Sequence, residues 1–200
     1  MDTPSFIKAF QHPWSIPKQS IVPAAEKLRP AAVLLCLNPK ASGANVILTE
    51  RAHHLKHHAG QISFPGGKVE SSDKNLTHTA CREAEEEIGL FSDKLTILGN
   101  MPPYTTVSGF SVTPVVACLE KAIDISIHLS ADENEVASIF EIPLSFILVG
   151  KNYQSLSLTR KNKQQMVHFI QYENRTIWGA TAGILYTLYQ QLSLVSSQQT

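Results

Sequence analysis

The sequence predicts an α/β (α+β) fold in which a mixed β-sheet carries helices on its faces. Short apolar segments bounded by turn residues predict strands, at 31–37, 45–50, 94–100, 112–119, 152–158 and 165–172. Two longer segments have apolar residues at helical spacing, at 76–88 and 176–192. Many strands and few helices in this order favour a sheet covered by helices.

Turn and cap residues separate these elements. Residues 31–37 (AAVLLCL) and 45–50 (NVILTE) flank Asn-Pro and Ser-Gly pairs, which favour a turn between two strands. The helix predicted at 76–88 ends before Gly89, because glycine commonly follows the last helical turn. Trp178 lies among the apolar positions of the second predicted helix, so we expect it in the core.

Length and charge restrict the location and the partners of the protein. The 200 residues suit a single domain, 1–200. The 17 Lys and Arg balance the 17 Asp and Glu, so no overall field attracts the chain to nucleic acid or to a membrane. No apolar segment approaches the ~20 residues of a membrane span, and no signal peptide is visible. We expect a cytoplasmic protein with reduced cysteines, and both monomer and homodimer remain open.

Four glutamates lie within five positions of a chain that has 17 acidic residues. On a helix, spacings of three and four return to one face, so Glu83, Glu86 and Glu87 share an arc while Glu85 points away. An adjoining stripe is expected to pack on the sheet and consists of Thr77, Ala80, Cys81, Ala84 and Ile88. The acidic arc therefore borders the core.

Two interpretations of the acidic arc are open. A solvated helix face is the common case, but like charges at i, i+4 and carboxylates near a helix C-terminus are each unfavourable by about 0.2–1 kcal/mol. A divalent cation would turn this repulsion into shared attraction, and oxygen ligands favour Mg²⁺ or Mn²⁺ over zinc. Arg82 lies at i, i+4 from Glu86; it either orients that carboxylate or forms an ordinary surface ion pair.

The segment before the helix, Phe64-Pro65-Gly66-Gly67, permits a tight turn with close backbone approach. Together with the acidic helix it resembles the Nudix box, G-x(5)-E-x(7)-R-E-U-x-E-E-x-G-U, where U is apolar. Gly67 opens the motif, and residues 82–90 fill its second half without a gap. Asp73 replaces the first glutamate, and eight residues instead of seven separate it from Arg82. The resemblance implies a Nudix-like mixed β-sheet sandwiched between helices.

A second motif upstream is similar to the signature of Nudix enzymes that act on coenzyme A, L-L-T-x-(T)-(S/A)-x(3)-R-x(3)-G-x(3)-F-P-G-G. Ile47-Leu48-Thr49 begins the match, while Arg51 replaces a threonine and Lys56 replaces the arginine. Lysine offers a point charge where arginine offers a planar fork. The resemblance implies substrate contacts at Arg51, Lys56, Gly60 and Gly67.

The likeness covers about residues 31–190, and several segments look like those of bacterial NudL-type members. It implies hydrolysis of the pyrophosphate bond of coenzyme A or a derivative, a small-molecule substrate, giving 3′,5′-ADP and 4′-phosphopantetheine or its acyl form. Carried over by position, the metal ligands for Mg²⁺ or Mn²⁺ are Glu83, Glu86, Glu87 and the backbone carbonyl of Gly66. Family members place the general base either in the box or in a later loop. Glu86 is therefore the first candidate and Glu135 the second, with Arg82 also in the catalytic set.

Residues 51–61 (RAHHLKHHAGQ) hold four of the eight histidines. Their i, i+4 spacing suits helical metal ligands, but no third zinc ligand is evident. We expect a positively biased loop that faces the phosphates of the substrate, with a solvated turn as the alternative. Further along, Tyr104 and Phe110 either contact adenine or pantetheine or are simply buried.

Two other functions fit the same residues. The acidic helix predicted at 76–88 could hold metal ions for the hydrolysis of another nucleoside diphosphate derivative, such as ADP-ribose, equally well. Only the upstream signature distinguishes coenzyme A from these other substrates. A non-catalytic Nudix-like nucleotide-binding module is a rival of a different class. Three glutamates beside Arg82 argue against this module, because binding alone does not need all of them.

Overall fold

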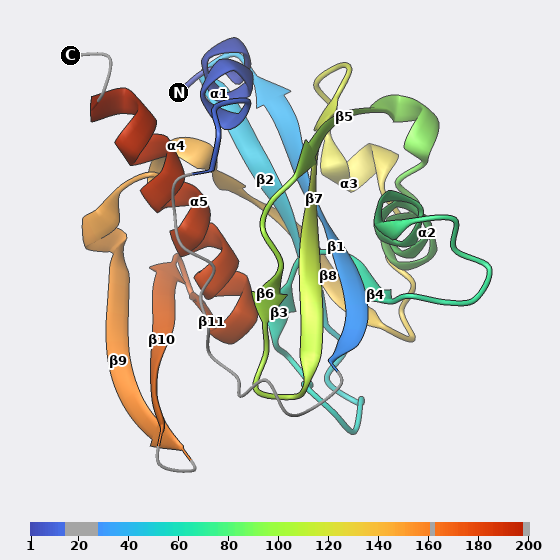
Figure 1. Cartoon of the computed structure of the whole chain (residues 1–200). Helices are drawn as coiled ribbons and strands as arrows, with labels where there is room; N and C mark the ends of the chain where they lie inside the picture. Colours follow the sequence, from blue (N-terminus) through green and yellow to red (C-terminus); the bar gives the residue numbers. More distant parts are fainter. Residues whose placement is uncertain (15–27, 161–162, 198–200) are drawn as a thin grey trace.

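The computed structural model describes residues 1–14, 28–160 and 163–197. This part of the chain forms a large mixed sheet, a second and smaller sheet, and helices on both sides of them (Figure 1). The predicted α/β (α+β) class is therefore confirmed. All three cysteines are free and buried. No helix among the described residues is long and apolar enough to cross a membrane.

The large sheet has its centre at β1 and β7. Its strands are β1 (Arg29–Lys40), β2 (Gly43–Arg51), β3 (Ile62–Ser63), β4 (Gly66–Lys68), β5 (Leu95–Asn100), β6 (Tyr104–Thr105), β7 (Phe110–Leu119) and β8 (Val136–Pro143). The order is β3-β2-β1-β7-β5, and β4, β6 and β8 pair with β1, β7 and β2. β1 is parallel to β7 and antiparallel to β2 and β4. The same strand thus supports β4 along its first part and β2 along its last.

The small sheet is antiparallel, in the order β11-β10-β9. It consists of β9 (Tyr153–Arg160), β10 (Lys163–Tyr172) and β11 (Arg175–Trp178). The strands predicted at 152–158 and 165–172 are therefore confirmed. Figure 1 shows β9 and β10 as a long hairpin beside the last helix.

Helices cover both faces of the large sheet. They are α1 (Thr3–Phe10), α2 (Leu76–Ile88), α3 (Ile125–His128), α4 (Leu144–Ile147) and α5 (Gly179–Ser197), with 3₁₀ turns at Ser92–Lys94 and Gly150–Asn152. In Figure 1, α2 lies on one side of the sheet and α5 on the other. Each side has its own cluster of buried apolar residues. The predicted arrangement of a sheet between helices is confirmed.

The continuous apolar run in β1 follows from these two layers. Side chains alternate across a strand, so Leu35 and Leu37 join the cluster below α5, whereas Leu34 and Cys36 join the cluster below α2. All four are fully buried. A strand covered on both faces favours apolar residues at successive positions, which explains the run.

The last helix begins later than predicted. Residues 175–178 form β11, in which Ile177 pairs with Ile170 of β10, and Gly179 has a positive φ of 68° at the start of α5. Strand alternation buries Ile177 and leaves Trp178 45% exposed. The prediction that Trp178 belongs to the core is wrong, because its neighbour Ile177 takes the inward position.

Gly89 ends α2, and we expect its replacement by alanine to destabilise the fold by about 1–2 kcal/mol. Gly89 has a φ of 65°, and a Cβ there would meet nothing closer than 3.6 Å. The cost would therefore come from the left-handed backbone and not from a clash. The midpoint of urea unfolding measures it, with Glu85→Ala on the exposed face of α2 as the control. An unchanged midpoint for Gly89→Ala would contradict this account.

Candidate active site

Helix α2 packs on the sheet through small side chains. Ala80 and Ala84 are fully buried in the cluster on this side of the sheet. Of the predicted stripe, Thr77 remains partly exposed, and the neighbouring Thr79 is buried in its place. The Thr79 hydroxyl donates a hydrogen bond of 2.9 Å to Asp73. A polar residue is therefore tolerated at the buried position because the preceding loop supplies its partner.

Strand β4 lies against both β1 and α2 because it begins with two glycines. A Cβ on Gly66 would lie 2.5 Å from the carbonyl oxygen of Ala32 and 2.6 Å from the Cα of Val33. A Cβ on Gly67 would overlap the carboxylate of Glu83. The approach of β4 to β1 requires glycine at position 66, and the missing Cβ at Gly67 leaves room for the carboxylate of Glu83. The segment comes close to the carboxylate of Glu83, and its close approach to a ligand remains a prediction.

Glu87 is a buried carboxylate beside Glu83. It is 5% exposed, and its Oε2 has no hydrogen-bond partner among the described residues. Burial, followed by the charge of Glu83, raises the pKa of Glu87 to about 8. The charge of Arg51 and a hydrogen bond from the backbone of Gly66 act in the opposite direction, whereas the charge of Glu135 raises the pKa further. Charges from three segments of the chain and a backbone hydrogen bond from a fourth therefore act on Glu87.

Glu83 shares this environment but has a partner. Burial raises its pKa, and the adjacent Arg82 partly offsets the shift. The Nη2 of Arg82 lies 3.1 Å from the Oε1 of Glu83. The charges of Glu86 and Glu135 raise the pKa of Glu83 further. Glu83 and Glu87 thus form an acidic pair at the edge of the core, with a single ion pair to Arg82 on the Glu83 side.

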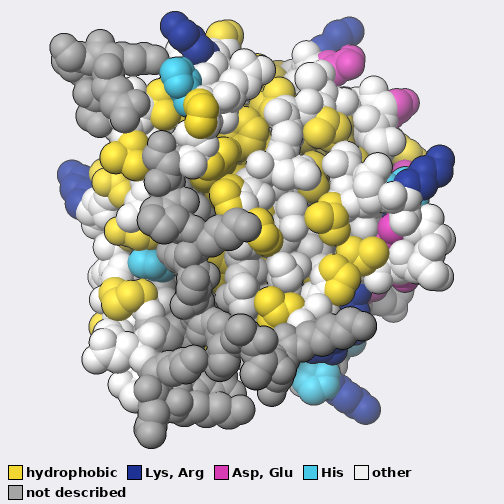
Figure 2. Space-filling view, in the orientation of Figure 1, with side chains coloured by type: hydrophobic (Ala, Val, Ile, Leu, Met, Phe, Trp, Pro, Cys, Tyr) yellow, Lys and Arg dark blue, Asp and Glu magenta, His cyan; other side chains and the backbone are white. Residues whose placement is uncertain are grey.

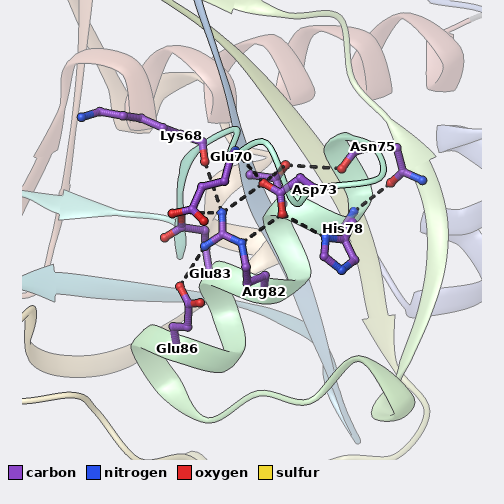
Figure 3. A network of polar contacts seen from close by, with 9 residues as sticks. Lys68, Glu70, Asp73, Asn75, His78, Arg82, Glu83 and Glu86 are labelled. Carbon is purple, nitrogen blue, oxygen red and sulfur yellow. Dashed lines mark hydrogen bonds and ion pairs between the residues drawn. The ribbon is translucent and has the colours of Figure 1, made fainter.

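Asp73 anchors Arg82 in a network of polar contacts (Figure 3). The Nε of Arg82 lies 3.0 Å from Oδ1 of Asp73, and Nη2 lies 3.1 Å from Oδ2. The Asp73 carboxylate is shielded from solvent and also accepts hydrogen bonds from the Glu70 amide and the Thr79 hydroxyl. These contacts, chiefly that of Arg82, hold the pKa of Asp73 well below its usual range. The shorter carboxylate at this motif position therefore still engages the guanidinium with two hydrogen bonds.

The predicted ion pair between Arg82 and Glu86 is present, with 2.9 Å between Nη1 and Oε2. The Glu86 side chain is 59% exposed and points to Arg82 (Figure 3). Within the described residues, no three His, Cys, Asp or Glu side chains are arranged to hold a metal ion. The structure thus brings Glu83 and Glu87 together but does not bring Glu86 into the same group.

The acidic pair nevertheless suits a divalent cation. A buried carboxylate oxygen without a partner is unfavourable, and the Oε2 of Glu87 is such an atom. A cation would satisfy that oxygen and offset the repulsion between Glu83 and Glu87. The Gly66 amide donates a hydrogen bond to the Glu87 carboxylate, and the predicted role of the Gly66 carbonyl as a metal ligand remains a prediction. Glu86 would complete this set after a change of rotamer that releases it from Arg82.

Backbone hydrogen bonds position Glu135 and Arg51. The Ala52 amide, next to Arg51, donates to the carbonyl of Glu135 at 2.8 Å. The Asp132 amide donates to the carbonyl of Glu87 at 2.9 Å. The end of β2, the segment before β8 and the end of α2 are therefore tied to one another. This explains how residues distant in sequence act electrostatically on the same carboxylate.

The histidine-rich loop between β2 and β3 is exposed over most of its length. A ring nitrogen of His53 lies 3.2 Å from Glu50, and one of His54 lies 3.1 Å from the Asn134 carbonyl. Gly60 has a φ of 68° and donates its amide to the Arg51 carbonyl at 3.1 Å. Lys56 lies on the exposed part of the loop. Of the predicted substrate contacts, Arg51 and Gly67 adjoin the acidic pair, and Gly60 shapes the loop.

The two aromatic residues of the β6–β7 region have different environments. The guanidinium of Arg29 stacks over the ring of Phe110, 3.9 Å from its centroid. Tyr104 is buried, and burial raises the pKa of its phenol. Sequence reasoning did not anticipate the contact between Arg29 and Phe110, because these residues meet only through the parallel pairing of β1 with β7.

The NUDIX domain family matches residues 27–145 of the chain. The chain belongs to the Nudix family. It is 40% identical over 166 residues to the "Uncharacterized Nudix hydrolase NudL" of Citrobacter koseri, covering 83% of this chain and 84% of that protein. The protein of the same name from Photorhabdus laumondii is 38% identical over 191 residues, covering 94% and 97%. A MutT/nudix family protein from Enterococcus faecalis has a TM-score of 0.50 at 14% identity, covering 96% of this chain and 70% of that one, and shows the fold alone.

Membership of the Nudix family confirms the resemblance in the sequence and supports a pyrophosphohydrolase activity. Nudix hydrolases generally use divalent metal ions. The acidic pair of Glu83 and Glu87 on α2 is the part of this structure that fits such an ion.

The buried Glu87 predicts that the metal-free protein loses stability as the pH rises. Its pKa is raised from 4.5 to about 8, so the folded state keeps a proton that the unfolded state releases. Stability should fall between these two values by on the order of a few kcal/mol and then level off. Urea unfolding at several pH values in the presence of a chelator measures the slope. Glu87→Gln should flatten it and Glu85→Gln should not; equal slopes in all three proteins would contradict the assignment.

Proposed function

We propose that the protein hydrolyses the pyrophosphate bond of coenzyme A or a derivative, with Mg²⁺ or Mn²⁺, to give 3′,5′-ADP and 4′-phosphopantetheine or its acyl form. The observation that carries this proposal is the buried acidic pair on α2, in which one oxygen of Glu87 has no partner. The upstream signature supports the choice of substrate. Arg51, which replaces a threonine of that signature, carries a positive charge that acts on Glu87.

The reaction adds water across a phosphoanhydride, and the difficulty is the negative charge that accumulates on the bridging oxygens. Divalent cations on Glu83 and Glu87, with Glu86 and the Gly66 carbonyl, would neutralise this charge and orient the water. Arg51 adjoins the same pair and is suited to bind a phosphate oxygen. Arg82 acts as a positioning residue, because its contacts with Asp73 and Glu83 hold the acidic helix in register with the loop.

Two acids are candidates for the general base, and the structure favours Glu135 over Glu86. Glu86 is held by Arg82 and would have to leave this ion pair to accept a proton from water. Glu135 acts electrostatically on both Glu83 and Glu87 and is tied to the end of β2 by its backbone. This reverses the order of the two candidates that the sequence indicates.

The substrate proposal predicts the products of a simple assay. The purified protein with Mg²⁺ or Mn²⁺ should convert coenzyme A to 3′,5′-ADP and 4′-phosphopantetheine, identified by mass. ADP-ribose and a reduced dinucleotide, tested in parallel, should be cleaved more slowly. Faster cleavage of either would retain the acidic pair but overturn the assignment of coenzyme A. No cleavage of any substrate would favour a nucleotide-binding module.

A variant of the acidic pair is the control for this assay. Glu87→Gln keeps the shape of the side chain but removes a charge, and turnover should fall at least about 100-fold, because even indirect partners of a metal commonly contribute 10–100-fold. Glu85→Gln, on the opposite face of α2, should keep wild-type turnover. Wild-type activity in Glu87→Gln would count against the mechanism.

The two base candidates predict different pH profiles. Glu135→Gln should lower kcat by about 10²–10⁴-fold and remove the acidic limb of the pH–rate profile. Glu86→Gln should lower kcat less and retain that limb. The profiles of kcat measured for both variants at saturating metal test this order. Loss of the limb in Glu86→Gln alone would restore Glu86 as the base.

A further inference from the structure

The first residue of strand β1 is an exposed arginine that is held in place at both its backbone and its side chain. The guanidinium of Arg29 lies over the ring of Phe110, and its Nη2 donates to the Ser108 carbonyl at 3.0 Å. The Arg29 amide donates to the Gly109 carbonyl, also at 3.0 Å. A guanidinium has five N–H donors, and within the described part of the chain only Ser108 accepts a hydrogen bond from this one. Most donors of a positioned guanidinium are therefore free for a ligand.

Arg29 also lacks a counter-charge. Of the arginines whose side chains the structure describes, Arg82 and Arg175 each have a carboxylate within 4.0 Å. Arg29 and Arg51 have none among the described residues. Arg51 adjoins the acidic pair of the candidate site, so Arg29 marks a second and separate place for a negative charge. A planar guanidinium is the side chain best suited to hold a phosphate group with two hydrogen bonds.

Lys68 supplies a second cation on the same face of the sheet. It lies opposite Ala31 in the antiparallel pair of β4 with β1. Arg29 is two positions before Ala31, so the side chains of Lys68 and Arg29 point to one side. The pairing continues toward Arg29, because the Val69 amide donates to the Pro30 carbonyl at 3.2 Å. Diagonal neighbours of this kind lie about 7–8 Å apart, within reach of long side chains. We call Arg29 and Lys68 the basic pair.

Strand β1 connects the basic pair to the candidate active site. Gly66, whose carbonyl is a predicted metal ligand, lies opposite Val33. At about 3.3 Å per residue, the backbone of Arg29 is about 13 Å along the strand from Val33, and Lys68 lies between them. Figure 3 shows the Lys68 side chain pointing away from the polar network around Arg82. Neither cation of the basic pair is therefore engaged by the carboxylates of that network.

The surroundings of the basic pair are positively biased. Figure 1 shows the start of β1 beside the β6–β7 turn at the lower end of the large sheet. In Figure 2 Lys, Arg and His side chains are visible at this lower end, whereas acidic side chains lie along the side that carries α2. Metal ions would be held at the acidic edge, and a further anionic group of the same ligand would be attracted to the lower end.

We propose that Arg29 and Lys68 bind the 3′-phosphate of coenzyme A, an inference that rests on the proposed function and names the group by which the substrate is selected. In coenzyme A the 3′-phosphate and the pyrophosphate are attached to the same ribose. With the pyrophosphate at the acidic pair, one ribose and the long side chains of the basic pair together can span the separation along β1. A phosphate monoester offers three acceptor oxygens and up to two negative charges, which suit a guanidinium and an ammonium group together.

The basic pair distinguishes substrates that the acidic pair treats alike. ADP-ribose and a reduced dinucleotide without this phosphate have a hydroxyl group at the same position, which would leave both cations without a counter-charge. The 3′-phosphate is remote from the reacting phosphorus, so its contacts are the same in the ground state and in the transition state. Such contacts lower KM and leave kcat unchanged.

Nucleotides without a pyrophosphate test this site apart from catalysis. 3′,5′-ADP and 5′-AMP are titrated calorimetrically into the full chain in the presence of a chelator, and 3′,5′-ADP should bind at least about tenfold more tightly. Arg29→Gln should remove this preference and leave the affinity for 5′-AMP unchanged, and Lys68→Gln should reduce it. Lys94→Gln is the matched control and should retain it. Lys94 also lies over an aromatic ring, 5.6 Å from the centroid of Phe91, but in the 3₁₀ turn before β5.

Coenzyme A and 3′-dephospho-coenzyme A extend the test to turnover. Arg29→Gln should raise KM for coenzyme A about tenfold, with kcat unchanged and with KM for the dephospho compound unchanged. An equal rise of KM for both substrates would show that Arg29 only holds the β6–β7 turn, and it would overturn the proposal.

The outcomes separate this proposal from the proposed function. Equal affinity for 3′,5′-ADP and 5′-AMP, or a preference that survives Arg29→Gln, would overturn the 3′-phosphate site even if coenzyme A is cleaved. A preference that Arg29→Gln removes, without cleavage of coenzyme A, would support the site and reject the hydrolase. 2′,5′-ADP provides the last outcome. Tighter binding of this isomer than of 3′,5′-ADP would assign the basic pair to a 2′-phosphorylated nucleotide and overturn the proposal.

Discussion

The contact between strand β4 and helix α2 is the constraint on which the candidate site depends. Gly66 and Gly67 let the backbone of β4 approach β1 on one side and Glu83 on the other more closely than any side chain would permit. The small side chains of Ala80 and Ala84 are fully buried and likewise let helix α2 pack closely on the sheet. Glu87 is buried as a consequence. A larger residue at position 66 would collide with the backbone of β1, and one at position 67 would displace the carboxylate of Glu83 from its place beside Glu87.

The charges around the helix show a division of roles. Arg82 contacts Asp73, Glu83 and Glu86 and leaves Glu87 without an ion pair to it. The network of Asp73 and Arg82 holds the loop before α2 against the helix, and these two charged groups pair chiefly with each other. The Glu87 carboxyl group therefore remains available to a divalent cation, which would displace the proton that its raised pKa retains. The contacts of Arg82 that stabilise the loop and the acidic pair of the candidate site thus lie on the same helix, α2.

How much could be predicted depended on whether the determining interactions were local. Helix α2 was predicted with its observed bounds, because Asn75 caps its start and Gly89 ends it within the segment itself. Trp178 was misplaced, because the pairing of β11 with β10 overrode an apolar spacing that looked helical. Strand β8 was missed, since its partner β2 lies far away in sequence. The burial of Glu87 and the convergence of Glu135 on it arise only from tertiary contacts, so only the resemblance pointed to Glu135.

The parallel pairing of β1 with β7 also bears on how the protein is made. β1 leaves the ribosome long before β7, and residues 29–37 need residues 110–118 beside them. Pairing between distant segments forms slowly, because a long loop must close first. The nascent helix α2 is therefore synthesised before the sheet that receives it is complete. Glu135 joins only when β8 pairs with β2. Glu135 and the acidic pair therefore come together only after synthesis has passed Pro143, so the growing chain passes most of its synthesis without the complete set of candidate residues.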